Sequence, residues 1–177
     1  LPEAQVDRFM MKVLVDYPTE EEEFVIAQRV TGRAVEVQAV CDTQALRALQ
    51  KQCQAVYVDP SLIQYAVRLV GATRQPARYE LAELAKYLSF GASPRATIGL
   101  VEGARALALL RGRRYALPED MVDLVPDVLR HRLVLSYEAL ADNLGADDIV
   151  QRVMKKIAVP DKPMAHAPHE NGNALPA

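Results

Sequence analysis

A single strand-like run followed by a long succession of helix starts constrains this fold more than any other feature of the sequence. Residues 9–15 (Phe-Met-Met-Lys-Val-Leu-Val) form a short apolar run that is typical of one buried strand, and Pro18 ends it. Because a strand is not stable without a partner, we expect this run to complete a sheet whose other strands lie in an absent, preceding part of a longer protein.

Helix starts recur along the rest of the chain. Thr19-x-x-Glu22 is a capping-box pattern, and the acidic residues 20–23 lie where the helix dipole favours negative charge. The pattern therefore predicts a helix that ends near Gly32, rather than a metal site. Capping residues, prolines and apolar periodicity predict further helices that start near residues 43, 60, 94, 118, 126 and 147. The fold is therefore expected to be mainly α.

Two glycines lie one turn apart inside the predicted helix at 94–110. Gly99 and Gly103 each cost ~1 kcal/mol relative to alanine in a helix interior. We expect close packing against a neighbouring element to offset this cost.

The start of that helix carries a cation. Ser93 is a good N-cap and Pro94 suits the first helical position, so Arg95 lies beside a terminus that already attracts anions. Arg95 gains nothing from the helix dipole there, which indicates a phosphate ligand. The alternative is a surface arginine that tolerates an electrostatic cost of ~0.3–1 kcal/mol.

A second arginine precedes the strand-like run. Arg8 ends a short turn or helix just before residue 9, at the expected rim of a sheet, where its side chain can project toward a neighbour. A salt bridge with Asp7 or Glu3 is the alternative.

Five segments in this order and spacing resemble the C-terminal part of MoxR-type AAA+ ATPases. They are LPEAQVDRF, KVLVDYP, GASPRA, ALLRGRRYALPEDM and DVLRHRLVLSYEA, and the resemblance covers roughly residues 1–157. It implies an α/β nucleotide-binding core followed by a helical lid. We then expect residues 1–32 to end the core, 33–59 to form a connector, 60–158 to form the lid and 159–177 to be a disordered tail.

The resemblance also implies two site residues. Arg95 matches the sensor 2 arginine, which reaches the nucleotide phosphates of its own subunit, and Arg8 matches the arginine finger, which reaches the neighbouring subunit's ATP site. Both roles suit a planar, permanently charged guanidinium that can hold two phosphate oxygens. A finger supplied in trans can accelerate hydrolysis by ~10³–10⁵ in other NTPases.

The chain departs from a complete ATPase in one decisive respect. It contains no Gly-x-x-x-x-Gly-Lys-Ser/Thr phosphate loop. ATP and Mg²⁺ are therefore expected as cofactors of the full-length protein only, and this stretch alone should be inactive. In a smaller departure, Leu117 stands where the family commonly has a threonine cap.

The resemblance implies a ring, expected to be a hexamer, that remodels or matures client proteins in a chaperone-like way. A protein with a von Willebrand factor A domain is an expected partner. The alternatives are a non-catalytic helical interaction module and the lid of a related helicase or DNA-loading ATPase.

Composition narrows the class of partner and the compartment. A net charge of −2 gives no support to a nucleic-acid partner, and no apolar run is long enough to span a membrane. Only Cys41 and Cys53 are present, which favours a reducing cytoplasm. His166 and His169 lie near each other in the expected tail, without the neighbouring ligands that a metal site needs.

Overall fold

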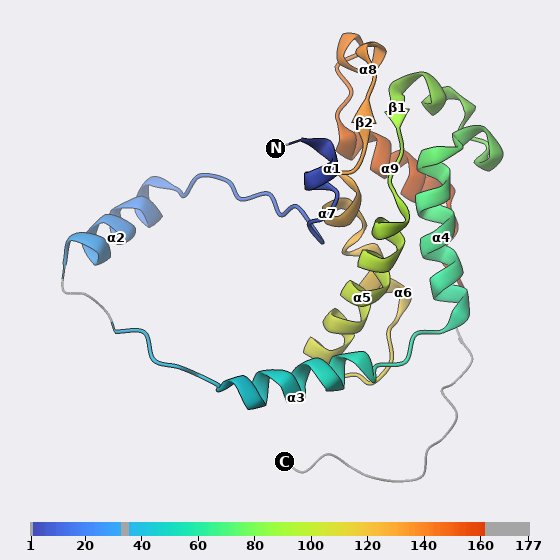
Figure 1. The fold of residues 1–177 in the computed structure, drawn as a ribbon. Helices are drawn as coiled ribbons and strands as arrows, with labels where there is room; N and C mark the ends of the chain where they lie inside the picture. The colour runs from blue at the N-terminus through green and yellow to red at the C-terminus, as the bar shows by residue number, and fades with distance from the viewer. Residues whose placement is uncertain (1, 33–35, 162–177) are drawn as a thin grey trace, which may run out of the picture.

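The structure, a computed structural model, describes residues 2–32 and 36–161 of the 177-residue chain. Most of the predicted tail, including both of its histidines, lies outside these described residues. The helices are α1 Glu3–Val6, α2 Glu20–Thr31, α3 Thr43–Gln54, α4 Pro60–Arg74, α5 Pro94–Leu110, α6 Pro118–Val122, α7 Val125–Leu129, α8 Tyr137–Ala141 and α9 Ala146–Lys156 (Figure 1). Two 3₁₀ helices, Pro76–Tyr79 and Ala82–Tyr87, follow α4.

The predicted caps are present where the longer helices begin. The Thr19 hydroxyl accepts a bond from the Glu22 amide, and the Glu22 carboxylate accepts one from the Thr19 amide, which completes the capping box of α2. Asp42 caps α3, and Asp59 caps α4. Ser93 caps α5 through the amide of Arg95. These caps satisfy amides that have no partner within their own helix.

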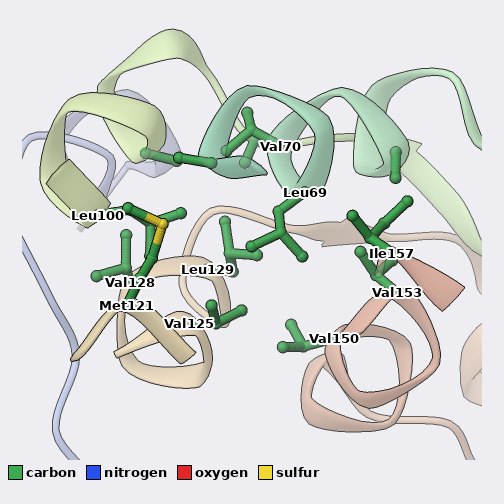
Figure 2. Close-up of a cluster of buried hydrophobic side chains, with 14 of the residues drawn as sticks. Leu69, Val70, Leu100, Met121, Val125, Val128, Leu129, Val150, Val153 and Ile157 are labelled. Carbon is green, nitrogen blue, oxygen red and sulfur yellow. The ribbon is translucent and has the colours of Figure 1, made fainter. Parts of the chain in front are cut away.

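The hydrophobic core lies between α4, α5, α6, α7 and α9 (Figure 2). Leu69 of α4, Leu100 of α5, Val128 of α7 and Val153 of α9 are all fully buried. Burying one such side chain stabilises the fold by about 1.5–3 kcal/mol. The core therefore makes one bundle of this part of the chain, whereas α2 has no buried residue and lies apart in Figure 1.

The glycine prediction is confirmed at Gly103 and not at Gly99. A Cβ on Gly103 would lie 2.8 Å from Leu124 Cδ1, whereas a Cβ on Gly99 would make an ordinary contact of 3.4 Å with Val128 Cγ1. The absence of a side chain at Gly103 lets α5 approach the α6–α7 region closely, and this packing offsets the low helix propensity of that glycine.

The run at residues 9–15 is extended but pairs with none of the described segments, and most of its side chains are exposed. A strand requires a neighbouring edge, and the partner strands were expected in a preceding part of a longer protein. The strand at residues 9–15 therefore stays a prediction. The backbone of this run is held at single points, for example by the Lys12 amide, which donates to the Asp127 carbonyl over 2.8 Å.

The described residues form a small two-stranded sheet elsewhere in the chain. β1 (Leu88–Phe90) pairs antiparallel with β2 (Val134–Leu135), and the register shifts between the paired residues. The sheet lies at the end of the bundle, where it fixes the loop that leads into α5 (Figure 1).

At the start of α6, where the Leu117 side chain cannot act as a cap, a buried carboxylate supplies the other half of a capping box by binding the N-cap amide. Asp120 is 0% exposed, and it accepts a hydrogen bond from the Leu117 amide over 2.7 Å. Its carboxylate also accepts bonds from Arg111 and Arg113. Burial by itself would raise the pKa of Asp120, but these hydrogen bonds outweigh it and lower the pKa below its ordinary value of 3.8.

Candidate functional site

Arg8 and Arg95, the two arginines singled out in the sequence, line the same cavity. Its volume is about 260 Å³. The lining residues are Asp7, Arg8, Met10, Arg95, Ile98, Gly99, Glu102 and Arg132. The cavity therefore lies between the segment that follows α1 and the first turns of α5.

Arg95 lies at the start of α5, as its sequence context predicted. Its amide donates to the Ser93 hydroxyl over 3.2 Å, and its side chain is 54% exposed. Arg95 Nε lies 3.8 Å from Asp7 Oδ2, which is a long and partly solvated ion pair. Such a pair is weak, so the guanidinium remains available to a ligand.

Asp7 changes the electrostatic argument made for Arg95. Its carboxylate accepts bonds from the Ser93 hydroxyl over 2.9 and 3.0 Å, which places a negative charge at the N-terminus of α5. This charge compensates Arg95 in part and is favoured by the helix dipole. A phosphate ligand is therefore not required to explain the cation, although one remains compatible with it.

Arg8 is exposed at the other wall of the cavity. The carboxylate of Asp7 pairs with Arg95 and Arg132 and forms no ion pair with Arg8. Among the described side chains, which do not include that of Glu3, no ion pair holds the Arg8 guanidinium. The side chain can thus reach an anion outside this chain.

Arg132 is a site residue that the sequence interpretation missed, and it ends the basic triplet Arg130-His131-Arg132. Its side chain is only 2% exposed, and its Nε donates to Asp7 Oδ1 over 3.1 Å. Its two terminal nitrogens donate to the carbonyls of Asp7 (3.1 Å), Phe9 (2.6 Å) and Met10 (3.0 Å). Burial lowers the pKa of Arg132, and the Asp7 carboxylate opposes that shift.

The triplet also lies at the C-terminal end of α7, where the helix dipole favours positive charge. Arg132 caps this end in part, because it donates to the Val128 carbonyl in the last turn of α7. The spacing of the triplet gave no sign that its main partners are carbonyls more than 120 residues earlier in the chain.

The other two members of the triplet hold the same segment. Arg130 donates to the Lys12 carbonyl over 2.9 Å and to Asp147 over 2.9 Å. The ring Nε2 of His131 lies 3.1 Å from the Phe9 carbonyl oxygen. Burial lowers the pKa of His131 and the positive charge of Arg132 lowers it further, against the raising effect of the Phe9 contact. A neutral ring that donates its N–H to Phe9 fits this environment.

The loop before Arg95 is fixed from the other side by Thr73, a buried residue of α4. The Thr73 hydroxyl donates to the Val70 carbonyl over 2.7 Å and accepts a bond from the Ala92 amide over 3.0 Å. A Cβ on Gly91 would lie 2.3 Å from the Thr73 carbonyl oxygen, so only glycine fits there. Thr73 and Gly91 together position the Ser93 cap, and with it Arg95.

A larger cavity of about 500 Å³ adjoins the same contacts and shares Asp7 and Arg132 with the first. No group of three or more His, Cys, Asp or Glu side chains in the described part of the chain could bind a metal ion. Among the helices of that part, none is long and apolar enough to cross a membrane.

Comparisons with known proteins agree with this arrangement. Residues 80–153 match the AAA lid domain. The chain is 41% identical over 176 residues to Chaperone MoxR1 of Mycobacterium tuberculosis, a match that covers 99% of this chain and 46% of that protein. It is 34% identical over 148 residues to Protein MoxR of Paracoccus denitrificans, covering 77% of this chain and 44% of the relative.

A solved structure is similar over nearly the whole fold. A putative ATPase from Cytophaga hutchinsonii superposes with a TM-score of 0.85 at 37% identity, and the match covers 91% of this chain and 49% of that one. This chain thus spans about half the length of the relatives that it matches.

Proposed function

Because this chain belongs to the MoxR family of AAA+ ATPases and includes an AAA lid domain, we propose that it is the nucleotide-sensing C-terminal part of a ring-forming ATPase. In this proposal Arg95 binds the phosphates of ATP held by its own subunit. Arg8 acts in trans on the ATP of the neighbouring subunit. The full-length protein uses ATP and Mg²⁺, and its phosphate loop lies outside this chain.

The observation that carries this proposal is the state of the two guanidinium groups. Arg95 is half exposed and has only a 3.8 Å ion-pair contact, to Asp7. Arg8 is exposed and forms no ion pair with a described side chain, a set that does not include Glu3. Phosphoryl transfer spreads negative charge over the γ-phosphate oxygens, and a guanidinium can bind two of them at once. Both arginines are therefore available for this chemistry.

The ring would be a hexamer in the cytoplasm that remodels or matures client proteins in a chaperone-like way. In each subunit, binding of the phosphates by Arg95 would draw the lid toward the core. The finger of each subunit would make hydrolysis depend on assembly. Clients, and a partner with a von Willebrand factor A domain, would bind the assembled ring.

The test is ATP hydrolysis by the full-length protein as a function of its concentration. Turnover per subunit should rise steeply as the ring assembles, and Arg8→Ala should abolish turnover while ATP binding persists. Arg152→Ala, which removes an exposed arginine of α9 far from the cavity lining, is the matched control and should behave as the unmodified protein. Normal turnover by the assembled Arg8→Ala ring would refute the finger role, and absence of any ATP binding would favour a non-catalytic interaction module.

A further inference from the structure

The segment that carries Arg8 is attached to the helical bundle through two side chains, Asp7 and Arg132. We propose that Asp7 and Arg132 are positioning residues for Arg8, so that the arginine-finger segment moves together with the lid. This inference rests on the proposed function, because it presupposes that Arg8 acts on a neighbouring subunit. Beyond that function, it identifies the contacts that connect the lid of one subunit to the ATP site of the next.

The contacts of Arg132 surround Arg8 on both sides. Its guanidinium binds the carbonyl of Asp7 before Arg8 and the carbonyls of Phe9 and Met10 after it. The Arg8 backbone is therefore fixed, whereas its side chain stays exposed. A group that must meet a phosphate in a defined geometry needs this combination of a fixed base and a free tip.

Asp7 connects this segment to the start of α5. Its carboxylate accepts bonds from Arg132 Nε over 3.1 Å and from the Ser93 hydroxyl over 2.9 Å, and Ser93 is the cap of the helix that carries Arg95. The residue next to the finger thus contacts the residue that positions the sensor. Rotation of the lid would carry Asp7, and with it Arg8.

The two ion pairs of Asp7 differ in strength. The pair with Arg95 is long and partly solvated, whereas the pair with Arg132 is short and nearly buried on the arginine side. A solvated pair is easily exchanged for a phosphate, but breaking a buried pair leaves an uncompensated charge. Arg95 can therefore leave Asp7 for a nucleotide while Arg132 keeps the finger segment in place.

Mixed rings of the full-length protein can test this assignment. Arg8→Ala subunits keep an ATP site but lack a finger, and Arg95→Ala subunits keep a finger but lack the sensor. At an ATP concentration well below the weakened Kd of the Arg95→Ala site, rings of either variant alone should be inactive, and mixing should restore hydrolysis at interfaces where an intact site meets an intact finger. Activity of the single-variant rings at this concentration would contradict the proposed function itself, separately from the present inference.

Asp7→Asn is then introduced into one partner at a time. In the finger-donating Arg95→Ala subunit it should lower the restored kcat by about tenfold or more with KM nearly unchanged, because misplacing a reacting group by ~1 Å can cost ~10²-fold. In the Arg8→Ala subunit, which donates only the ATP site, it should lower the restored kcat much less, because an asparagine oxygen can still accept the Ser93 hydrogen bond that supports Arg95. Asp147→Asn, which removes an exposed partner of Arg130, is the matched control and should have no such positional effect.

Arg132→Lys is the second variant, and it decides the matter if Asp7→Asn subunits fail to assemble. It keeps the positive charge but cannot reproduce the forked contacts to Asp7 and the three carbonyls. Arg132→Lys should likewise lower the restored kcat when it is in the finger-donating subunit and much less when it is in the subunit that donates the ATP site. Equal losses from either subunit would mean a merely structural role and would overturn the inference, as would no loss from either.

Discussion

Asp7 Oδ2 lies 2.9 Å from the Ser93 hydroxyl, although 86 residues separate the two in the chain. This contact joins the segment that carries Arg8 to the capped helix that carries Arg95. It also explains how a cation is tolerated at the N-terminus of α5, since the Asp7 carboxylate provides the negative charge that the helix end favours.

Replacing Arg95 should weaken nucleotide binding by the full-length protein. Arg95→Ala removes hydrogen bonds to a charged phosphate, which are worth about 1.5–3 kcal/mol, so the affinity for a fluorescent ATP analogue should fall by about 10- to 100-fold. Nucleotide-dependent lid closure, followed by energy transfer between labels on core and lid, should weaken with it. Arg95→Lys should recover part of the affinity, and unchanged binding by Arg95→Ala would rule out the sensor role.

Two glycine substitutions should have opposite consequences. Gly91→Ala places a Cβ 2.3 Å from the Thr73 carbonyl oxygen, and the shift it forces should lower the free energy of unfolding by about 1–3 kcal/mol. Gly99→Ala makes ordinary contacts with Val128 Cγ1 at 3.4 Å and the Met10 carbonyl oxygen at 3.6 Å and gains up to ~1 kcal/mol of helix propensity, so stability should be unchanged or increased. Urea denaturation of both variants measures the difference, and equal destabilisation would contradict the packing described for these loops and helices.

Substitution of Asp120, the buried hub that pairs with Arg111 and Arg113, should lower stability more than substitution of the exposed Asp123. Asp120→Asn removes a buried charge from between Arg111 and Arg113, whose side chains stay 41% and 21% exposed, and weakening hydrogen bonds to charged groups costs about 1.5–3 kcal/mol. Asp123→Asn removes only the half-exposed partner of Arg111, for which about 0–1 kcal/mol is expected. Thermal unfolding should separate the two variants clearly, and similar midpoints would show that the hub is not a stabilising feature.

His131 should make stability depend on pH near neutrality. Its pKa is lowered from 6.5 by burial and by Arg132, so the folded state favours the neutral ring. Its contribution is therefore complete above pH 6.5 and is lost as the pH falls from 6.5 toward the lower folded-state pKa. The free energy of unfolding should decrease over this window.

His131→Gln should remove that part of the pH dependence, because glutamine can still donate to the Phe9 carbonyl but does not titrate. His166→Gln with His169→Gln is the control for the remaining histidines of the chain. A pH profile that His131→Gln leaves unaltered would assign the effect to other groups.

The sequence by itself determined where the longer helices begin. The capping box at Thr19, the caps at Asp59 and Ser93, and the interruption at Pro126 were all readable, because a cap or a proline acts on amides within three or four residues of itself. The same locality allowed Arg95 to be identified beside a helix start. Asp120 shows the limit of this reasoning. Its hydrogen bond to the Leu117 amide follows from local sequence, but its burial between two arginines depends on the tertiary structure.

Only the tertiary structure decided which segments pair and which charges are buried. The run at residues 9–15 has the pattern of a strand, but the segments that pair among the described residues are Leu88–Phe90 and Val134–Leu135, because pairing depends on a partner that local pattern does not specify. In the sequence, Arg132 was indistinguishable from its neighbour Arg130. Its contacts to Asp7 and the carbonyls beyond exist because folding brings segments more than 120 residues apart into contact, and no pattern within a few residues of either one encodes that proximity.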